Sequence, residues 1–141
     1  MQKQLLAGLI FGFLTCAIGA EEAKVEQRQT IFKKVEKGTE SLEILIDHGA
    51  MSDVVVKADA LSKQIAQLVN LFPEDTRGKG RSSSKIWKNW DDFSARLSRF
   101  ESAYVQMSNA ASNEDSKRVK QAFKLADSSC RSCHMKYRSL W

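Results

Sequence analysis

The amino-acid sequence predicts an all-α protein, built as an antiparallel up-down four-helix bundle. Apolar residues recur at steps of three and four along four separate segments, which is the spacing of one buried helix face. The 141 residues include one proline and seven glycines, too few for the many turns of an all-β protein. Mostly short connections between the four segments favour neighbouring helices that run in opposite directions.

The first 20 residues have the layout of a secretory signal peptide. A basic start is followed by a nearly unbroken apolar run over residues 5–14, and small residues precede the expected cleavage after Ala20. This run is too short to span a bilayer as a stable helix. The sequence therefore predicts export to the periplasm, one mature domain over residues 21–141, and no membrane attachment after cleavage. A lipoprotein signal ending at Cys16 is the competing interpretation.

The first two helices are expected over residues 22–47 and 53–72. Gly49 ends the first, because glycine commonly follows the last residue of a helix, and Pro73 ends the second. Ser52-Asp53 is expected to cap the second helix. The apolar faces consist of Val25, Phe32, Val35, Leu42 and Ile46 in the first helix and of Val55, Ala58, Leu61, Ile65, Leu68 and Phe72 in the second. Arg28 and Thr39 fall on the same face of the first helix.

The one long connection is the segment from Glu74 to Ser84, which contains two glycines, three serines and several charged residues. This composition predicts an exposed crossover loop. A loop of this length in a small domain often has a task, so covering a bound group and simple solvated linkage are both open.

The last two helices are expected over residues 84–111 and 114–138. Asn113-Glu114-Asp115 supplies a cap and acidic side chains suited to the positive end of the fourth helix. The apolar faces consist of Ile86, Trp90, Phe93, Leu97, Phe100, Tyr104, Met107 and Ala111 in the third helix and of Val119, Ala122, Ala126, Cys130, Cys133 and Tyr137 in the fourth.

The last of these faces carries the motif Cys130-Arg131-Ser132-Cys133-His134, which is the attachment pattern of c-type haem. Two thiols three residues apart lie on one helix face, where both can add to the vinyl groups of one porphyrin. His134 then offers an imidazole nitrogen as the proximal iron ligand. A redox dithiol does not need the adjacent histidine, and a zinc site would need a fourth ligand, with His48 as the only other histidine. The sequence predicts one covalently bound haem c inside the bundle.

Charge and cysteine content narrow the function classes. The net charge is +5, and basic residues interleave with acidic ones along the helices, which argues against nucleic acid as a partner. Of the three cysteines, Cys16 would leave with the signal peptide. Only the pair of the haem motif would then remain, so no disulfide framework is expected.

Over essentially all of residues 21–141 the chain resembles cytochrome c prime, a family of secreted four-helix haem proteins of bacteria. The segments that carry the resemblance are CRSCHMKYR at the C-terminus, LFPEDTRG and KIWKNWDDF around the crossover, and Arg28-Gln29 with Phe32 in the first helix. The resemblance implies that Arg28 and Gln29 approach the haem propionates and that Phe32 lies over the distal face of the iron. It also implies that Arg138 lies near the proximal imidazole.

Phe32 would decide the function, because a phenyl ring cannot ligate iron. The expectation is a five-coordinate, high-spin haem whose crowded apolar pocket binds NO or CO, in NO scavenging or resistance. Peroxidase activity is not expected, since such chemistry needs a distal acid-base residue. The alternative is a low-spin or high-spin cytochrome that passes electrons between periplasmic redox partners, although residues 21–47 contain no methionine to serve as a sixth ligand.

The resemblance also implies a homodimer formed through the first two helices. Ile31, Ile44 and Leu45 are expected on the outer side of the first helix, where they would add apolar surface to that interface.

Overall fold

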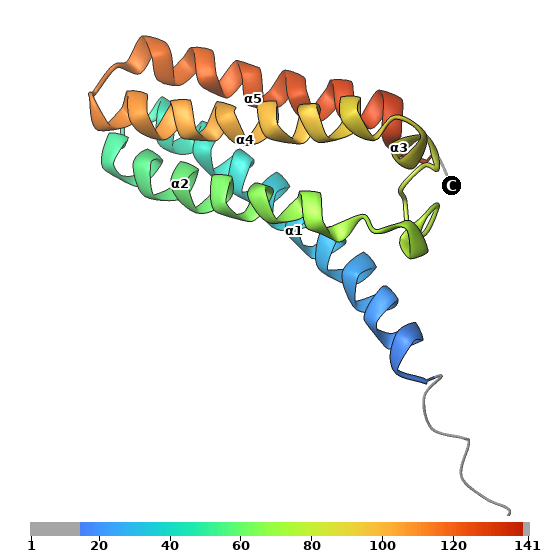
Figure 1. Cartoon of the computed structure of the whole chain (residues 1–141). Helices are drawn as coiled ribbons and strands as arrows, with labels where there is room; N and C mark the ends of the chain where they lie inside the picture. The colour runs from blue at the N-terminus through green and yellow to red at the C-terminus, as the bar shows by residue number, and fades with distance from the viewer. Residues whose placement is uncertain (1–14, 140–141) are drawn as a thin grey trace, which may run out of the picture.

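The computed structural model of the protein describes residues 15–139, which form four long helices and one short α-helix (Figure 1). The long helices are α1 (Thr15–Asp47), α2 (Met51–Gln67), α4 (Trp90–Ser112) and α5 (Ser116–Tyr137), and the short one is α3 (Lys85–Lys88). Two 3-10 turns, Leu68–Leu71 and Glu74–Thr76, lie between α2 and α3. The prediction of an all-α four-helix bundle is confirmed.

The helices do not pack equally tightly around the bundle. α2 packs extensively against α4, and α4 against α5, while α1 is joined mainly to α2. α1 and α5 touch over a much smaller area, and the N-terminal half of α1 diverges from the other helices in Figure 1. The side of the bundle between α1 and α5 is therefore its least closed side.

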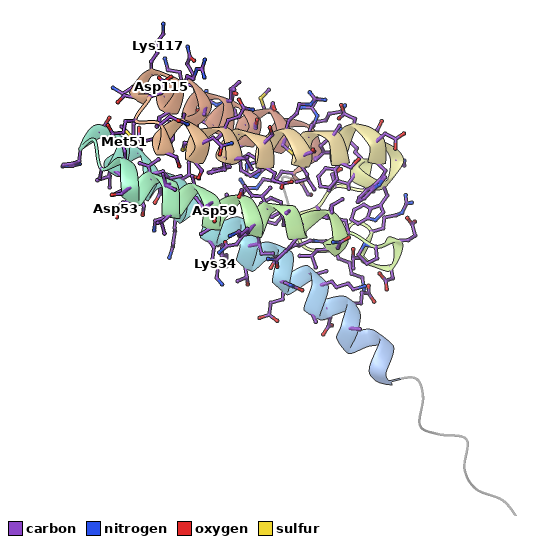
Figure 2. All side chains as sticks on the ribbon, turned by 60° about the vertical axis from the view of Figure 1, so that its left-hand side comes forward. Lys34, Met51, Asp53, Asp59, Asp115 and Lys117 are labelled. Atoms are coloured by element: carbon purple, nitrogen blue, oxygen red, sulfur yellow. The ribbon has the colours of Figure 1, made fainter. Side chains whose placement is uncertain are left out.

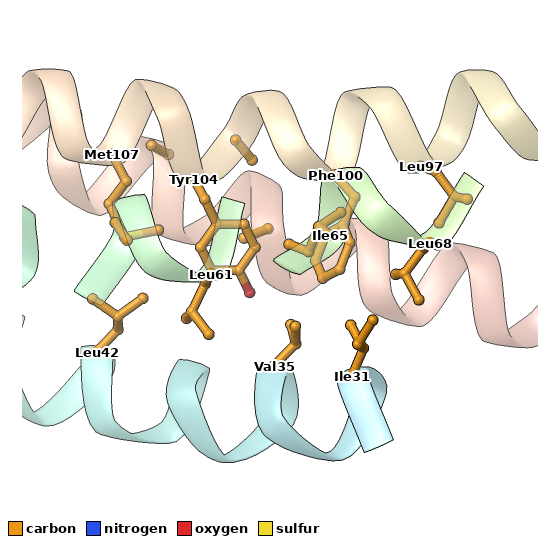
Figure 3. Packing of buried hydrophobic residues seen from close by; sticks show 14 of the residues in the cluster. Ile31, Val35, Leu42, Leu61, Ile65, Leu68, Leu97, Phe100, Tyr104 and Met107 are labelled. Atoms are coloured by element: carbon orange, nitrogen blue, oxygen red, sulfur yellow. The ribbon is translucent and has the colours of Figure 1, made fainter. Parts of the chain in front are cut away.

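The core is apolar and largely follows the periodic faces of the sequence, which include nine of the ten residues labelled in Figure 3, Ile31 being the exception. Tyr104 is fully buried, and its hydroxyl forms a hydrogen bond of 2.6 Å with the hydroxyl of Thr39, which satisfies both polar groups. α1 approaches α2 closely at Gly38, where an added Cβ would lie 2.6 Å from a methyl carbon of the buried Leu61.

One prediction for α1 is wrong: Ile31, expected to face outward, is buried at 6% exposure. The buried stripe of α1 contains Arg28, Ile31, Val35, Leu42 and Ile46. Phe32 lies one residue round the helix and is only half-buried, at the edge of the core. Ile44 is exposed as expected, and Leu45 is half-buried.

The boundaries of the second and third helices differ from the expected ones. α2 ends at Gln67 and is followed by the 3-10 turn Leu68–Leu71, whereas an α-helix to residue 72 was expected. The third helix is interrupted at Asn89, whose backbone leaves the helical region and whose side-chain amide donates to the carbonyl of Lys85, a local bond that competes with the helix. α2 begins at Met51 after Ala50, without a side-chain cap, so Ser52 and Asp53 lie inside the helix. Asp115 caps α5 as expected and accepts from the backbone N–H of Arg118.

The expected signal peptide lies mostly outside the described residues. α1 is already helical at Thr15 and continues through Ala20 without a break. Within residues 15–139, no helix has the length and apolar character needed to cross a membrane.

Candidate functional site

The haem motif occupies the last two turns of α5, facing the side where α1 passes. Cys130 and Cys133 are half-buried and pack against the core, and neither forms a disulfide. They share one face because a separation of three residues is close to one helical turn. His134 is more exposed than either thiol and lies beside them on α5.

Phe32 of α1 is the side chain that the structure brings to His134. The two ring centroids are 6.5 Å apart and the ring planes meet at 65°, an edge-on arrangement. Two residues that are about a hundred positions apart in the chain are thus neighbours across the thin interface between α1 and α5. The sequence predicted both as haem contacts, and the structure places them together.

The surroundings keep the site residues neutral. Burial raises the pKa of the Cys130 thiol to about 11, with a further contribution from the charge of Asp127. Burial also raises the pKa of Cys133. Partial desolvation lowers the pKa of His134, and the positive charge of Arg138 lowers it further. At neutral pH the site therefore presents two protonated thiols and an imidazole with a free lone pair.

Arg28 occupies a different position from the other expected haem contacts. Its side chain is 1% exposed and donates to the carbonyl of Leu71 at 3.0 Å, to the hydroxyl of Thr76 at 2.8 Å and to the carbonyl of Lys79 at 2.7 Å. The guanidinium also stacks 4.6 Å from the centre of the Phe72 ring. In this arrangement Arg28 fastens the crossover to α1.

Arg28 is a buried cation that has no ion pair with any carboxylate of residues 15–139. Burial lowers its pKa. The carbonyl oxygens compensate part of the desolvation of the charge, which would otherwise be costly. Contact with a haem propionate stays a prediction.

Gln29 lies next to the crossover rather than in the interior. It is exposed, and its amide is so close to Gly80 that a Cβ added there would lie 2.6 Å from Nε2. Gly80 also has φ +63°, a conformation that other residues rarely adopt. The crossover thus runs directly over the face of α1 that carries Gln29.

Arg138 follows α5 in an extended conformation and is exposed. Arg138 pairs with Ser82 in an isolated antiparallel bridge, which holds the segment just after α5 against the crossover. The effect of its charge on the pKa of His134 agrees with the expected location near the imidazole.

Sequence reasoning missed a carboxylate that organises the end of α5. Asp92 accepts from Tyr137 at 2.6 Å, from Arg96 at 2.8 Å and from Lys136 at 3.0 Å. Arg96 in turn donates to the hydroxyl of Ser132, inside the motif. These bonds fix the turn of α5 that carries His134 against α4. The spacing of Asp92 and Arg96 by four residues was the only sequence signal for this network.

The residues at this site suit a haem. The least closed side of the bundle lies between α5 and α1. α5 contributes two half-buried thiols and an imidazole with an available lone pair, and α1 contributes an apolar ring opposite the imidazole. The zinc alternative would need further ligands, and within residues 15–139 no three Cys, His, Asp or Glu side chains are grouped closely enough to hold a metal ion.

Comparison with known proteins agrees with the fold. A cytochrome c-556 from Agrobacterium fabrum is 24% identical over 147 residues, which cover 96% of this chain and 94% of that protein. The nitric oxide complex of a mutant of cytochrome c prime from Alcaligenes xylosoxidans superposes with a TM-score of 0.76 at 23% identity, over 84% of this chain and 96% of that one. A ferrous variant of the same cytochrome with bound NO gives 0.77 at 22% identity, over 86% and 97%.

The bundle, the motif on its last helix and these likenesses agree with a match of residues 23–138 to the family model described as Cytochrome C'. The protein belongs to the cytochrome c' family of haem proteins.

Proposed function

We propose that the protein is a periplasmic haem protein that binds NO or CO next to Phe32. Cys130 and Cys133 hold one haem c by two thioether bonds, and His134 is the proximal ligand. When bound, the haem supplies an iron with one open position for a small gas. The observation that carries the proposal is the edge-on approach of Phe32 to His134 at 6.5 Å.

Phe32 selects the ligand by its chemistry. Its ring has no lone pair for iron and no N–H or O–H group to stabilise a polar bound molecule. A pocket of this kind disfavours the binding of O₂, because bound O₂ is polar. The binding of NO or CO depends less on a hydrogen-bond donor. Phe32 also has no acid-base group, so it offers no support for peroxidase chemistry. The NO complexes of the two Alcaligenes structures support NO as the ligand.

His134 is held ready to coordinate iron. The pKa of the imidazole is lowered by partial desolvation and by Arg138, so its lone pair is available at neutral pH. The network around Asp92 holds the last turn of α5, and hence the backbone of His134, in place. NO scavenging or resistance is the proposed role, and it requires no redox partner for ligand capture.

Export is part of the same proposal. Cleavage after Ala20 would leave Glu21 as the first residue, and its carboxylate forms an ion pair with Lys79 of the crossover. The acidic residues Glu21 and Glu22 would then lie in the first turn of the mature helix, where they favour the helix dipole. The intact mass of the periplasmic protein tests both the cleavage site and the attachment of one haem.

The test of gas binding is a CO titration of the ferrous holoprotein, followed by NO, for the wild type and Phe32→Ala. A high-spin spectrum and a change in CO affinity of about tenfold or more in Phe32→Ala are expected, because the ring is removed from the open position. Phe123→Leu, a half-buried aromatic of α5, serves as the control.

Two outcomes would contradict the proposal. Unchanged affinity in Phe32→Ala would show that this ring does not adjoin the ligand. A low-spin spectrum of the wild type without any response to CO would favour the electron-transfer alternative instead.

A further inference from the structure

The positive charge of the protein is concentrated at one end of the bundle. Residues 76–90 and 128–141 contain no acidic residue and together hold eight of the 22 basic ones. The remainder of the chain therefore carries 14 basic and 17 acidic side chains. The net charge of +5 therefore comes from these two segments.

Hydrogen bonds join these two segments in space. The backbone N–H of Ser83 donates to the carbonyl of Tyr137 at 2.9 Å, and the N–H of Ser139 donates to the carbonyl of Arg81 at 2.9 Å. The bridge between Ser82 and Arg138 lies between these two bonds. α3 and the end of α5 consequently form one surface at the same end of the bundle, as Figure 1 shows.

Four of the eight cations at this end of the bundle have no ion pair among the described residues. Nearby carboxylates pair with the other four, namely Arg77, Lys79, Arg131 and Lys136. No ion pair within residues 15–139 involves the remaining four, which are Arg81, Lys85, Lys88 and Arg138, and all of them are exposed. Asp75 and Asp91 border the surface without pairing with them. We call these four residues the basic surface.

The basic surface lies next to the end of α5 that carries the haem motif, because Arg138 directly follows α5 and backbone hydrogen bonds join the Arg81 segment to it. Met135, next to His134, is 83% exposed and is the one strongly exposed large apolar side chain among the described residues 76–90 and 128–139. An exposed methionine with a charged rim resembles the composition of protein interfaces, in which methionine and arginine are enriched. A membrane surface would be bound more firmly by several apolar side chains on one helix face, and within residues 15–139 the end of α5 offers only this exposed methionine.

We propose that the basic surface docks an acidic electron-transfer protein beside the haem site. Docking there would bring the partner's redox centre close to His134, and attraction between the opposite charges would speed the encounter. One electron passes in each encounter: the partner loses it, and ferric iron becomes ferrous. The location near iron rests on the haem attachment proposed above, whereas the binding of an acidic partner does not.

The experiment uses flavodoxin, an acidic flavin protein, as the probe with the ferric holoprotein. Flavodoxin hydroquinone gives up one electron to become the semiquinone, and stopped-flow absorbance reports the second-order rate constant. Titration with oxidised flavodoxin measures binding without any electron transfer. Both measurements are repeated from low to high ionic strength.

The test variant is Lys85→Glu with Lys88→Glu, and the matched control is Lys117→Glu with Lys120→Glu. Both change the net charge by the same amount. Lys117 lies at the opposite end of the bundle, near the start of α5 (Figure 2), and Lys117 and Lys120 are both exposed. Lys85→Gln with Lys88→Gln is a milder change that keeps α3 free of new charges.

For the wild type we expect a rate constant that falls as salt is added. The test variant should lower it about tenfold at low salt, the glutamine pair should lower it less, and the control should stay within about twofold. Flavodoxin affinity should follow the same order. Ligand binding by CO should be equal in all variants, so failure of the gas-binding proposal would be seen separately.

Three results would overturn the docking proposal. Equal losses in the test and control variants would show an effect of net charge alone. A rate constant and an affinity independent of salt would exclude electrostatic docking. If the test variant lost only co-sedimentation with vesicles of phosphatidylglycerol while keeping flavodoxin affinity, the basic surface would be a lipid-binding surface instead.

Discussion

The hydroxyl of Tyr137 donates to the carboxylate of Asp92 at 2.6 Å, which joins the last residue of α5 to the start of α4. The same carboxylate binds Arg96 and Lys136, so one acidic side chain receives donors from both helices. Because His134 lies one turn before Tyr137, the position of the expected iron ligand depends on a residue 42 positions earlier in the chain.

Asp92→Asn should make the protein less stable near neutral pH and should flatten the dependence of its stability on acid. Bonds from Arg96, then Tyr137, then Lys136 hold the pKa of Asp92 well below its ordinary range. A carboxylate with a lowered pKa stabilises the fold above its unfolded-state pKa of about 4, and this contribution is lost as the pH falls through the folded-state value. Thermal unfolding between pH 7 and pH 3 measures the effect.

The matched control for that experiment is Asp91→Asn, since no ion pair within the described part of the chain involves the neighbouring Asp91. Equal slopes of melting temperature against pH in Asp92→Asn and the wild type would show that the network does not stabilise the fold. A change in the spectrum of the Asp92→Asn holoprotein at constant pH would add that the network positions His134.

Arg28→Met should destabilise the protein by about 3 kcal/mol, because the carbonyls of Leu71 and Lys79 and the hydroxyl of Thr76 lose a charged donor in a buried place. Urea unfolding measures the free energy. Lys34→Met, on an exposed position of the same helix (Figure 2), should cost less than about 0.5 kcal/mol. Arg28→Lys should recover only part of the loss, since an ammonium cannot span several acceptors. An effect of Arg28→Met equal to that of Lys34→Met would be incompatible with a fastening role.

Gly38→Val should cost about 2 kcal/mol of unfolding free energy. A Cβ at this position would lie 2.6 Å from Leu61, which is buried, so α1 and α2 would be forced apart. Lys37→Val introduces the same β-branched residue at the adjacent, exposed position and serves as the control for helix propensity. If the two valine variants unfold at the same urea concentration, the close contact between α1 and α2 at Gly38 does not contribute to the free energy of unfolding.

Val56→Glu should shift the protein from dimer to monomer, if the dimer forms through α1 and α2 as the family resemblance implies. Val56 is 71% exposed and Ile44 is 60% exposed, and both belong to these two helices. Sedimentation velocity measures the distribution. Leu125→Glu, at an equally apolar but distant position on α5, should leave it unchanged. A wild type that is monomeric at all concentrations would contradict the predicted dimer.

The periodic spacing of apolar residues was sufficient to predict most of the fold. The strongest repeat, from Phe93 to Ala111, gave a helix whose predicted apolar positions are buried at Phe93, Leu97, Phe100, Tyr104, Met107 and Ala111. The interruption at Asn89 was not predictable in this way, because Ile86 and Trp90 keep the three-four spacing on both sides of it. A local side-chain bond, rather than the pattern of apolar residues, ends the short helix there.

The site residues were predictable where they belong to a short sequence motif, and much less so where their role depends on tertiary contacts. Cys130, Cys133 and His134 follow from one motif. The burial of Arg28 does not, since its acceptors are mainly backbone carbonyls, whose positions cannot be inferred from residue types. The burial of Ile31 was also missed because it depends on tertiary contact. Phe32, the larger apolar residue, was assigned to the buried face, but it lies at the edge of the core beside His134, and Ile31 is buried instead.

The crossover is attached to α1 through Arg28 and through the ion pair of Glu21 with Lys79, and to the end of α5 through Ser82. These attachments join parts of the chain that are far apart in sequence, whereas each helical hairpin closes locally. Contacts of this kind form late during folding, because the cost of closing a long loop comes first. Their strength should therefore appear mainly in the unfolding rate, so the crossover governs how long the folded protein persists rather than how quickly it forms.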